Sequence, residues 1–213
     1  MRRQITLLLL LFIVITATTQ PLCNVRTFTV RDGLAANNIS GMEQTKDNLM
    51  WFSTWNGICC FDGYEFTTFR NDNTGKVLTS NRMLTVRPNS RGDVWSLSYD
   101  RNLYLFDTHS CKFVNVGELI RKQFNTNINV RAVYPLANGR SWVVCNGDKE
   151  NFLINDSLIL YGQGIERVVA KDGMLRSNII KKVLLDDSGR EWILTAKGAS
   201  IMCWHPVVCP LYA

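Results

Sequence analysis

A four-fold internal repeat constrains the fold of this chain more than any other feature of its sequence. Each copy begins at an Asn and reaches a Trp 13 or 14 residues later. The Asn residues are spaced 43, 48 and 49 residues apart, and the Trp residues 44, 47 and 50. The chain is therefore an array of related units. The four pairs are Asn38 and Trp51, Asn81 and Trp95, Asn129 and Trp142, and Asn178 and Trp192.

A turn signal stands three residues before each Trp. The residue at this position is Asn48, Gly92, Gly139 or Gly189, and Asn and Gly are the residues that tolerate a positive φ. A tight hairpin with right-handed twist requires such a residue. We therefore predict a β-hairpin in each copy, and we expect each Trp ring to pack between adjacent sheets.

The first copy, residues 38–69, shows what one unit looks like. Its four short runs are rich in aromatic and β-branched residues, and the dipeptides Asp47-Asn48, Asn56-Gly57 and Asp62-Gly63 separate them. These dipeptides are strong turn signals between short strands. The copy therefore predicts one four-stranded antiparallel, up-and-down sheet.

Four-stranded units with this period are typical of an all-β chain built from β-propeller blades. We expect four blades within residues 23–213, and residues 116–124 predict one short helix after the second. The fourth copy supplies three strands, and residues 25–30 are a candidate for the missing outer strand, which would close a four-bladed ring. An open arc, an incomplete propeller, is the favoured alternative. The expected blades are approximately residues 38–69, 81–116, 129–161 and 178–204.

Residues 1–22 have the pattern of an export signal. Arg2 and Arg3 precede an apolar run at residues 5–15, and small and polar residues follow it. The run is shorter than the roughly 20 residues that span a bilayer. We therefore expect residues 23–213 to be periplasmic. All seven cysteines follow this segment without a CxxC pair, so we expect neither a metal nor a cofactor, and the net charge of +6 is too small to predict nucleic-acid binding.

The first two copies resemble the two-component regulator propeller repeat. The similarity extends over residues 25–204 and is strongest in the first two copies. It rests on residues 31–34, 38–40, 44–47, 51–54, 57 and 61–64 of the first copy and on residues 81–82, 92–95 and 104–107 of the second.

This resemblance implies a periplasmic sensor region of a hybrid two-component histidine kinase from Bacteroidetes. Proteins of that family sense oligosaccharides and regulate genes for polysaccharide use through a phosphorelay. The kinase region has no counterpart in this sequence, so the resemblance implies a truncated sensor, with further blades and the kinase module encoded in the same or an adjacent gene. A homodimer is a further expectation. A stand-alone secreted propeller that binds a glycan or a protein is the alternative.

The geometry of a propeller predicts where a ligand would bind. The start of each innermost strand and the turn between the second and third strands share one face. Amides, arginines and aromatic rings at these places suit the hydroxyls and flat faces of sugars. The candidate ligand-binding residues are Asn81, Arg82, Trp55, Asn56, Tyr99, Asp100 and Arg101, and Asn38, Asn129, Arg131, Asn146 and Asn178 occupy corresponding places.

Catalysis is not expected. The chain has two histidines, His109 and His205, and both lie in turn-like sequence. A propeller glycosidase or lyase would need two carboxylates that face one cleft. The candidate acids, Asp62, Glu65, Asp72, Asp100 and Glu166, stand mostly in turns, where capping of the backbone explains them.

Overall fold

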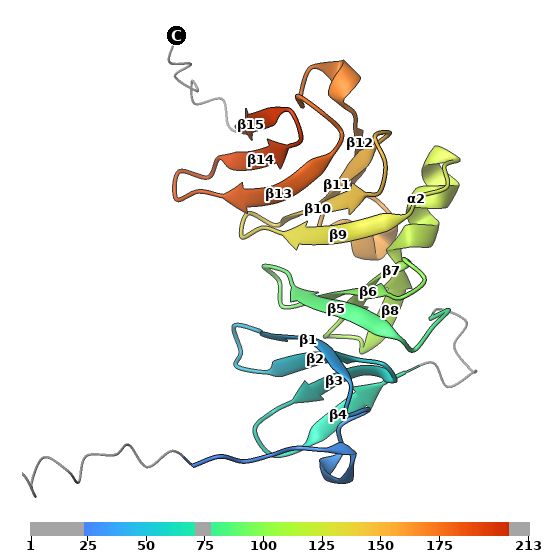
Figure 1. The fold of residues 1–213 in the computed structure, drawn as a ribbon, viewed down its shortest axis with the longest axis vertical. Helices are drawn as coiled ribbons and strands as arrows, with labels where there is room; N and C mark the ends of the chain where they lie inside the picture. Colours follow the sequence, from blue (N-terminus) through green and yellow to red (C-terminus); the bar gives the residue numbers. More distant parts are fainter. Residues whose placement is uncertain (1–23, 71–77, 205–213) are drawn as a thin grey trace, which may run out of the picture.

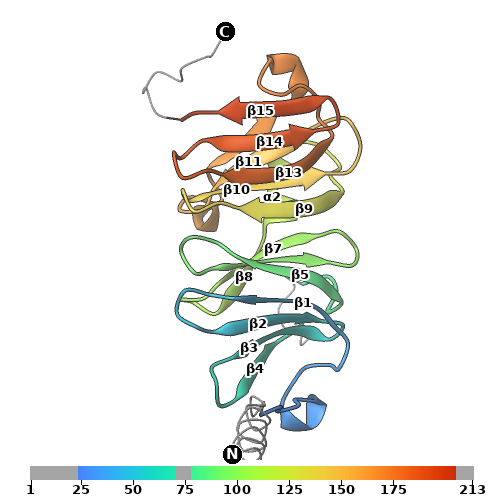
Figure 2. The same cartoon turned by 60° about the vertical axis from the view of Figure 1, so that its left-hand side comes forward.

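The computed structural model describes residues 24–70 and 78–204 and consists of four antiparallel sheets in chain order. Figure 1 shows the sheets one after another along the long axis of the molecule, and Figure 2 shows the same order from a second direction. The described residues form an arc and do not close into a ring. The predictions of an all-β propeller fold and of an open arc are therefore confirmed.

The first blade contains β1 (Ile39–Gln44), β2 (Met50–Thr54), β3 (Gly57–Phe61) and β4 (Phe66–Phe69). Each strand pairs with the next along the chain. The turns between them fall where the sequence predicts them, because Asn48, Gly57 and Gly63 all have positive φ.

The second blade contains β5 (Met83–Pro88), β6 (Val94–Ser98), β7 (Leu103–Asp107) and β8 (Lys112–Asn115), and the predicted helix α2 (Val116–Phe124) follows it. The side chain of Asn115 caps this helix by accepting a hydrogen bond from the Glu118 N–H. Ile120 and Val116 bury the inner side of the helix against the second and third blades. The prediction of a helix at residues 116–124 is confirmed.

The third blade contains β9 (Val130–Pro135), β10 (Arg140–Cys145), β11 (Asn151–Asn155) and β12 (Ile165–Val168), with the short 3₁₀ helix η2 (Ile159–Tyr161) before β12. The outer strand β12 follows η2 and lies beyond the approximate end of this blade expected at residue 161. Gly162 and Gly164, both with positive φ, lead the chain back from η2 to the sheet.

The fourth blade has three strands in the described residues: β13 (Ile180–Leu185), β14 (Glu191–Thr195) and β15 (Gly198–Met202). The expectation that residues 25–30 supply its outer strand is wrong. Phe28 instead lies at the first blade, where its ring centroid is 4.9 Å from that of Phe61 and 5.5 Å from that of Phe66. Contacts with these aromatic rings hold the segment at the opposite end of the arc.

The repeated segments before the first and fourth blades have the same local structure. The 3₁₀ helices η1 (Val30–Asp32) and η3 (Ala170–Asp172) each end at a glycine with left-handed backbone, Gly33 and Gly173. The side chain of Asn37 or Asn178 accepts the first backbone N–H of the corresponding helix. The two segments also match in sequence, because residues 31–39 and 171–179 are similar at an offset of 140 residues.

The hydrophobic core is divided among the interfaces between blades. Trp51 fills the interface between the first and second blades, Trp95 the next one and Trp142 the third. Leu34 and Ala35 cover Cys59 on the outer face of the first blade. Trp192 differs, since 38% of its surface is exposed. The expected packing of a Trp between sheets therefore holds for three of the four.

Some sequence-based predictions concern residues that lie outside the described part of the chain. They are the expected export signal, Cys23, Asp72, His205 and Cys209. In the described part of the chain, Cys203 is disulfide-bonded and Cys59, Cys60, Cys111 and Cys145 are free thiols. None of the helices described is long and apolar enough to cross a membrane.

Candidate functional site

One face of the arc is built from the same backbone contact in every blade. The first residue of the turn between the second and third strands donates its N–H to a carbonyl at the start of the innermost strand. These N···O distances are 3.2 Å for Trp55 to Asn38, 2.8 Å for Tyr99 to Arg82, 2.8 Å for Asn146 to Asn129 and 2.9 Å for Ala196 to Ile179. The turns and strand starts therefore share one face, which we call the binding face.

Three of the sequence-predicted residues meet on this face. The guanidinium carbon of Arg82 lies 3.9 Å from the ring centroid of Trp55 and 4.3 Å from that of Tyr99. Trp55 comes from the β2–β3 turn, Tyr99 from the β6–β7 turn, and Arg82 directly precedes β5. We call these three side chains the aromatic–arginine stack. A hydrogen bond of 2.7 Å from the Gly57 N–H to the Asn81 carbonyl joins the two blades beside it.

The stack leaves polar and aromatic groups available to a ligand. Trp55 is 50% exposed and Tyr99 is 57% exposed. The Arg82 Nε is buried and has no hydrogen-bond partner among the described residues, and no salt bridge within them involves Arg82. Cation–π contacts of this kind contribute about 0.5–1 kcal/mol each at exposed sites. The guanidinium is thus oriented by two rings and is not neutralised by a carboxylate there.

Asn56 and Asn81 lie beside the stack but make contacts that shape the turn. The Asn56 side chain donates to the Ala35 carbonyl at 3.3 Å, and its backbone N–H donates to the Thr54 hydroxyl at 3.0 Å. The Asn81 carbonyl accepts the bond from Gly57. Both residues therefore have a structural role whether or not they touch a ligand.

Asp100 and Arg101 occupy the β6–β7 turn. Asp100 accepts hydrogen bonds from the hydroxyls of Ser98 and Thr79 and from the side-chain amide of Asn102. Burial raises the pKa of Asp100, but these hydrogen bonds outweigh it and the pKa lies below its ordinary value. Its oxygens are therefore largely committed to the turn. Arg101 is exposed and has a positive φ of 64°.

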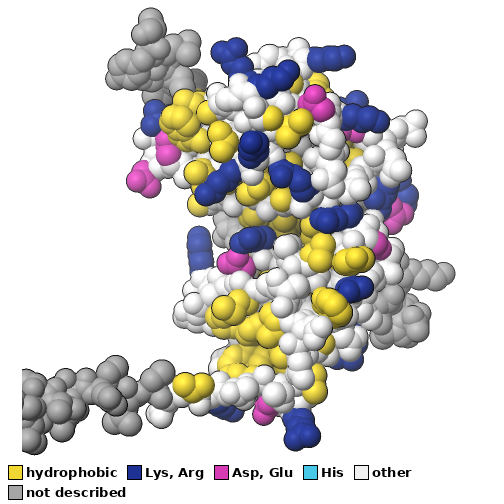
Figure 3. Space-filling view, viewed as in Figure 1, with side chains coloured by type: hydrophobic (Ala, Val, Ile, Leu, Met, Phe, Trp, Pro, Cys, Tyr) yellow, Lys and Arg dark blue, Asp and Glu magenta, His cyan; other side chains and the backbone are white. Residues whose placement is uncertain are grey.

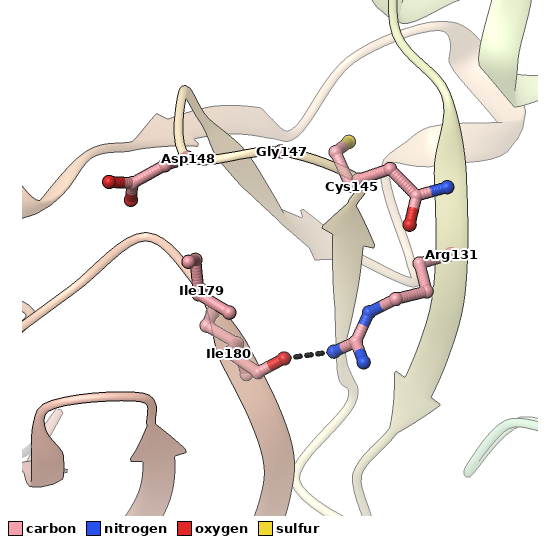
Figure 4. A pocket seen from close by; sticks show the side chains of 7 residues that line it. Arg131, Cys145, Gly147, Asp148, Ile179 and Ile180 are labelled. Carbon is pink, nitrogen blue, oxygen red and sulfur yellow. Dashed lines mark hydrogen bonds between the residues drawn. The ribbon is translucent and has the colours of Figure 1, made fainter.

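A second feature of the binding face is a pocket of about 200 Å³ between the third and fourth blades. Figure 4 shows Arg131 extending from β9 toward β13, where its guanidinium donates to the Ile180 carbonyl. Asp148 lies at the other end of the pocket and points away from Arg131. Asn146 also lines the pocket, and its side chain donates to that of Asn129 at 2.9 Å.

Of the residues predicted for this face, Arg131 and Asn146 line the pocket, whereas Asn129 and Asn178 do not. The other lining residues were not predicted from the sequence. Those residues are Cys145, Gly147, Asp148, Ile179 and Ile180. A signal was present, because the dipeptide Asn146-Gly147 is itself a turn signal. The Asn178 side chain accepts a hydrogen bond from the Ala170 N–H and donates one to the carbonyl of Asp148, which lines the pocket.

The nucleophilic and acid–base groups that the structure describes do not form a catalytic arrangement. Burial raises the pKa of Cys145 to about 12, so this thiol stays protonated beside the pocket. His109 is exposed in the β7–β8 turn, where its N–H donates to Asp107. Asp62 caps its own turn by accepting from the N–H groups of Tyr64 and Glu65. Within the described residues, no three His, Cys, Asp or Glu side chains cluster closely enough to hold a metal ion.

The comparisons with known proteins agree with this fold. Residues 33–56 match the family described as two component regulator propeller. The extracellular domain of hybrid two component system BT3049 from B. thetaiotaomicron is similar, with a TM-score of 0.56 and 22% identity over 79% of this chain and 21% of that one. The extracellular domain of BT4673 from the same organism gives a TM-score of 0.56 at 16% identity, covering 84% of this chain and 25% of that one.

Propellers with other names also share the fold. Virginiamycin B lyase from Staphylococcus aureus has a TM-score of 0.51 and 14% identity, over 80% of this chain and 56% of the lyase. No curated protein sequence matches the chain. The chain spans about a quarter or less of the two B. thetaiotaomicron domains, and at these identities the solved structures establish the propeller fold alone.

Proposed function

Since this chain carries a two-component regulator propeller repeat within an open array of propeller blades, we propose that it is a ligand-sensing propeller segment of a hybrid two-component sensor. It lies in the periplasm, in a sensor anchored to the inner membrane. Its ligand is an oligosaccharide, and the sensor regulates genes for polysaccharide use through a kinase module. In this scheme ligand binding changes the packing of the blades and so shifts the sensor between two states.

The observation that carries the proposal is the aromatic–arginine stack. Half-exposed rings of Trp55 and Tyr99 offer flat apolar surfaces on which the C–H face of a sugar ring can pack. Arg82 lies between them, and a guanidinium has five N–H donors in a fixed plane that can reach sugar hydroxyls. The residues come from separate strands and turns, so the site forms only when the first two blades pack together.

Relatives support the sensing role, and the binding face explains how it could work. A ligand on the stack would touch both the first blade, through Trp55, and the second, through Arg82 and Tyr99. A ligand that binds one arrangement of the two blades more tightly than another would shift the equilibrium toward that arrangement. The proposed sensor thus couples a ligand contact to a blade interface.

The test is direct binding of neutral and acidic oligosaccharides to the purified chain, by an array followed by isothermal titration calorimetry. We expect binding of at least one oligosaccharide class. Trp55→Ala should weaken it about tenfold or more, since the loss of one stacking contact and of the orientation of Arg82 is of the order of 1–2 kcal/mol. Arg82→Ala should weaken the same ligand.

The matched control is Tyr161→Ala, because Tyr161 is an aromatic side chain that is 80% exposed in η2, outside the binding face. This variant should bind as the original chain does. If no oligosaccharide binds, the oligosaccharide ligand is wrong. If one binds equally well to the Trp55, Arg82 and Tyr161 variants, the stack is not the site.

A further inference from the structure

A groove of about 380 Å³ runs across the innermost strands of three consecutive blades. It is lined from β5 by Thr85 and Arg87, from β9 by Arg131 and Tyr134, and from β13 by Lys182. We call it the inner-strand groove. It differs from the aromatic–arginine stack, but β5 connects the two, because Arg82 directly precedes this strand and Arg87 lies near its end.

The charged side chains that line the inner-strand groove are all basic. Each of the three strands contributes one cation, Arg87, Arg131 or Lys182, and no acidic side chain among the described residues lines the groove. Figure 3 shows Lys and Arg side chains gathered over the middle of the molecule, where β9 and β13 lie side by side. Like charges brought together in a concave surface raise the local potential and favour an anion.

Two of the three cations are positioned by neighbouring groups. Arg87 forms a salt bridge with Glu43 of β1, and this carboxylate offsets its charge. Arg131 donates one hydrogen bond to the Ile180 carbonyl, which leaves further N–H donors of its guanidinium for a ligand. Lys182 is exposed on β13. Among the described residues, the groove therefore has two cations without a carboxylate partner, the guanidinium of Arg131 and the ammonium group of Lys182.

The remaining wall suits a ring-shaped ligand. Tyr134 is fixed by its hydroxyl, which donates to the Lys181 carbonyl at 3.0 Å, and its ring lines the groove together with Val133 and Leu184. Cations beside an apolar and aromatic wall match a sugar ring that bears a carboxylate or a sulfate. A small inorganic anion would leave the apolar wall unused.

The distance along β5 links the groove with the stack. Arg82 and Arg87 are five residues apart, which corresponds to about 16 Å along an extended strand. Thr85 and Arg87 are two residues apart and therefore lie on the same side of β5. A linear oligosaccharide can thus follow the strand from the binding face into the groove.

We propose that the ligand is an acidic oligosaccharide, and that the inner-strand groove holds one of its carboxylate or sulfate groups through Arg131 and Lys182. This inference rests on the proposed function, which gives an oligosaccharide as the ligand. It adds that the oligosaccharide is acidic and that it contacts the groove as well as the stack. The neutral end of the ligand lies on the aromatic–arginine stack. The ligand follows β5 from there, and Arg87 lies near the end of this strand, in the groove.

The experiment is titration calorimetry of the purified chain with three probes. These are trigalacturonate, its fully methyl-esterified form, which has the same rings without the charges, and a sulfated heparin tetrasaccharide. We expect at least one of the two acidic probes to bind, and the ester to bind about tenfold more weakly than trigalacturonate if the carboxylate is recognised. The affinity for the acidic probe should fall as salt is raised, because mobile ions screen exposed charges. Binding of the tetrasaccharide but not of trigalacturonate would support an acidic ligand and would favour a sulfated oligosaccharide over a galacturonate.

Lys182→Gln tests the groove itself. It should weaken the bound acidic probe about threefold to tenfold, since one exposed cation contributes of the order of 1 kcal/mol. Lys112→Gln is the matched control, because Lys112 is an exposed lysine on β8, the outer strand of the second blade. It should change the affinity less than about twofold. Circular dichroism verifies that both variants fold.

Several outcomes would overturn the inference. One is equal binding of trigalacturonate and its ester, another is equal loss in the two lysine variants, and a third is no binding of either acidic probe. If neutral oligosaccharides bind through Trp55 while Lys182→Gln has no effect, the proposed function stands and only the inference about the groove fails.

Discussion

Asp156 is a carboxylate buried where the second and third blades meet. It accepts a hydrogen bond of 2.7 Å from the Ser141 hydroxyl, while its second oxygen has no hydrogen-bond partner among the described residues. Burial is the main cause that raises its pKa, and the nearby carboxylate of Asp93 adds to it, so that the pKa reaches about 6. An ionised Asp156 therefore opposes folding.

The raised pKa of Asp156 makes the free energy of unfolding depend on pH. Between about pH 4 and pH 6 the unfolded chain has lost the Asp156 proton and the folded chain still holds it, so the free energy of unfolding falls as pH rises. The full effect is of the order of 3 kcal/mol. We expect Asp156→Asn, which keeps the shape and the acceptor for Ser141, to remove this slope and to stabilise the protein at pH 7.

Denaturant unfolding at several pH values measures this prediction. Asp172→Asn is the control, because Asp172 lies in η3 and is not buried. It should leave the slope between pH 4 and pH 6 unchanged. An unfolding free energy for Asp156→Asn that follows pH as the original chain does would contradict the prediction.

Whether a repeated Trp has a hydrogen-bond acceptor for its indole N–H depends on one residue of the next blade. The indole N–H of Trp95 donates to Ser141 at 2.9 Å, and that of Trp142 donates to Glu191 at 2.8 Å. Each acceptor stands directly before the Trp of the next blade. The second blade has Val94 at this position, and the Trp51 N–H has no partner among the described residues. Of the three Trp rings that are packed between blades, two are therefore hydrogen-bonded and one is not.

At the scale of elements, the strands of inner and terminal blades differ in burial. All five residues of β6 are buried, because adjacent side chains face the first and third blades in turn. In β14, Glu191, Ile193 and Thr195 are buried, and Trp192 and Leu194 between them are exposed. A strand between two blades buries both faces, whereas this one buries only the face toward the third blade.

The β2–β3 turn requires a glycine for two separate reasons. Gly57 has a φ of +113°, and a Cβ at this position would lie 2.4 Å from the carbonyl oxygen of Phe69. Gly63 has a similar φ of +102° but open space around it. A side chain at Gly63 would therefore meet backbone strain alone, whereas a side chain at Gly57 would meet both strain and a steric clash.

We expect Gly57→Ala to lower the free energy of unfolding more than Gly63→Ala does, by about 1–3 kcal/mol, which is the usual cost of forcing an extra carbon into a packed site. Both variants carry the strain of positive φ, about 1–2 kcal/mol. Chemical denaturation followed by Trp fluorescence provides the comparison. Equal losses in the two variants would show that the backbone near Phe69 moves away without cost.

At the scale of the whole molecule, the outer face of the fourth blade is apolar. Leu184 and Ile201 lie directly opposite Trp192 on its two sides, and Leu194 is two residues further along the same strand. All four are at least partly exposed. An apolar sheet face of this kind favours association with another protein surface.

We therefore expect the isolated chain to self-associate as its concentration rises and Leu194→Lys to reduce this association. Leu194 is 47% exposed, so a lysine there adds charge to the face without entering the core. Sedimentation velocity measures the result. Leu158→Lys is the control, because Leu158 is a similarly exposed leucine (41%) that precedes η2 in the third blade. A monomer at all concentrations would contradict the prediction, and a homodimer stays a prediction until this measurement is made.

Local patterns in the sequence predict most of the secondary structure of this protein. The spacing of Asn and Trp predicts four blades, the residues before each Trp predict their turns, and Asn48, Gly92, Gly139 and Gly189 all have positive φ in the structure. The α2 helix was also predictable. These features depend on local backbone preferences and on short-range periodicity, and both are visible in a single sequence.

Which residues come together depends on how the sheets stack and cannot be read from these local patterns. The contacts of Arg82 with Trp55 and Tyr99 join residues from two blades, and the inner-strand groove joins three. The buried Asp156, the position of Phe28 at the first blade and the exposure of Trp192 likewise follow from how the sheets stack. The repeat is nearly the same in every copy, but burial and electrostatics depend on the neighbouring blade, and a local pattern does not contain that neighbour.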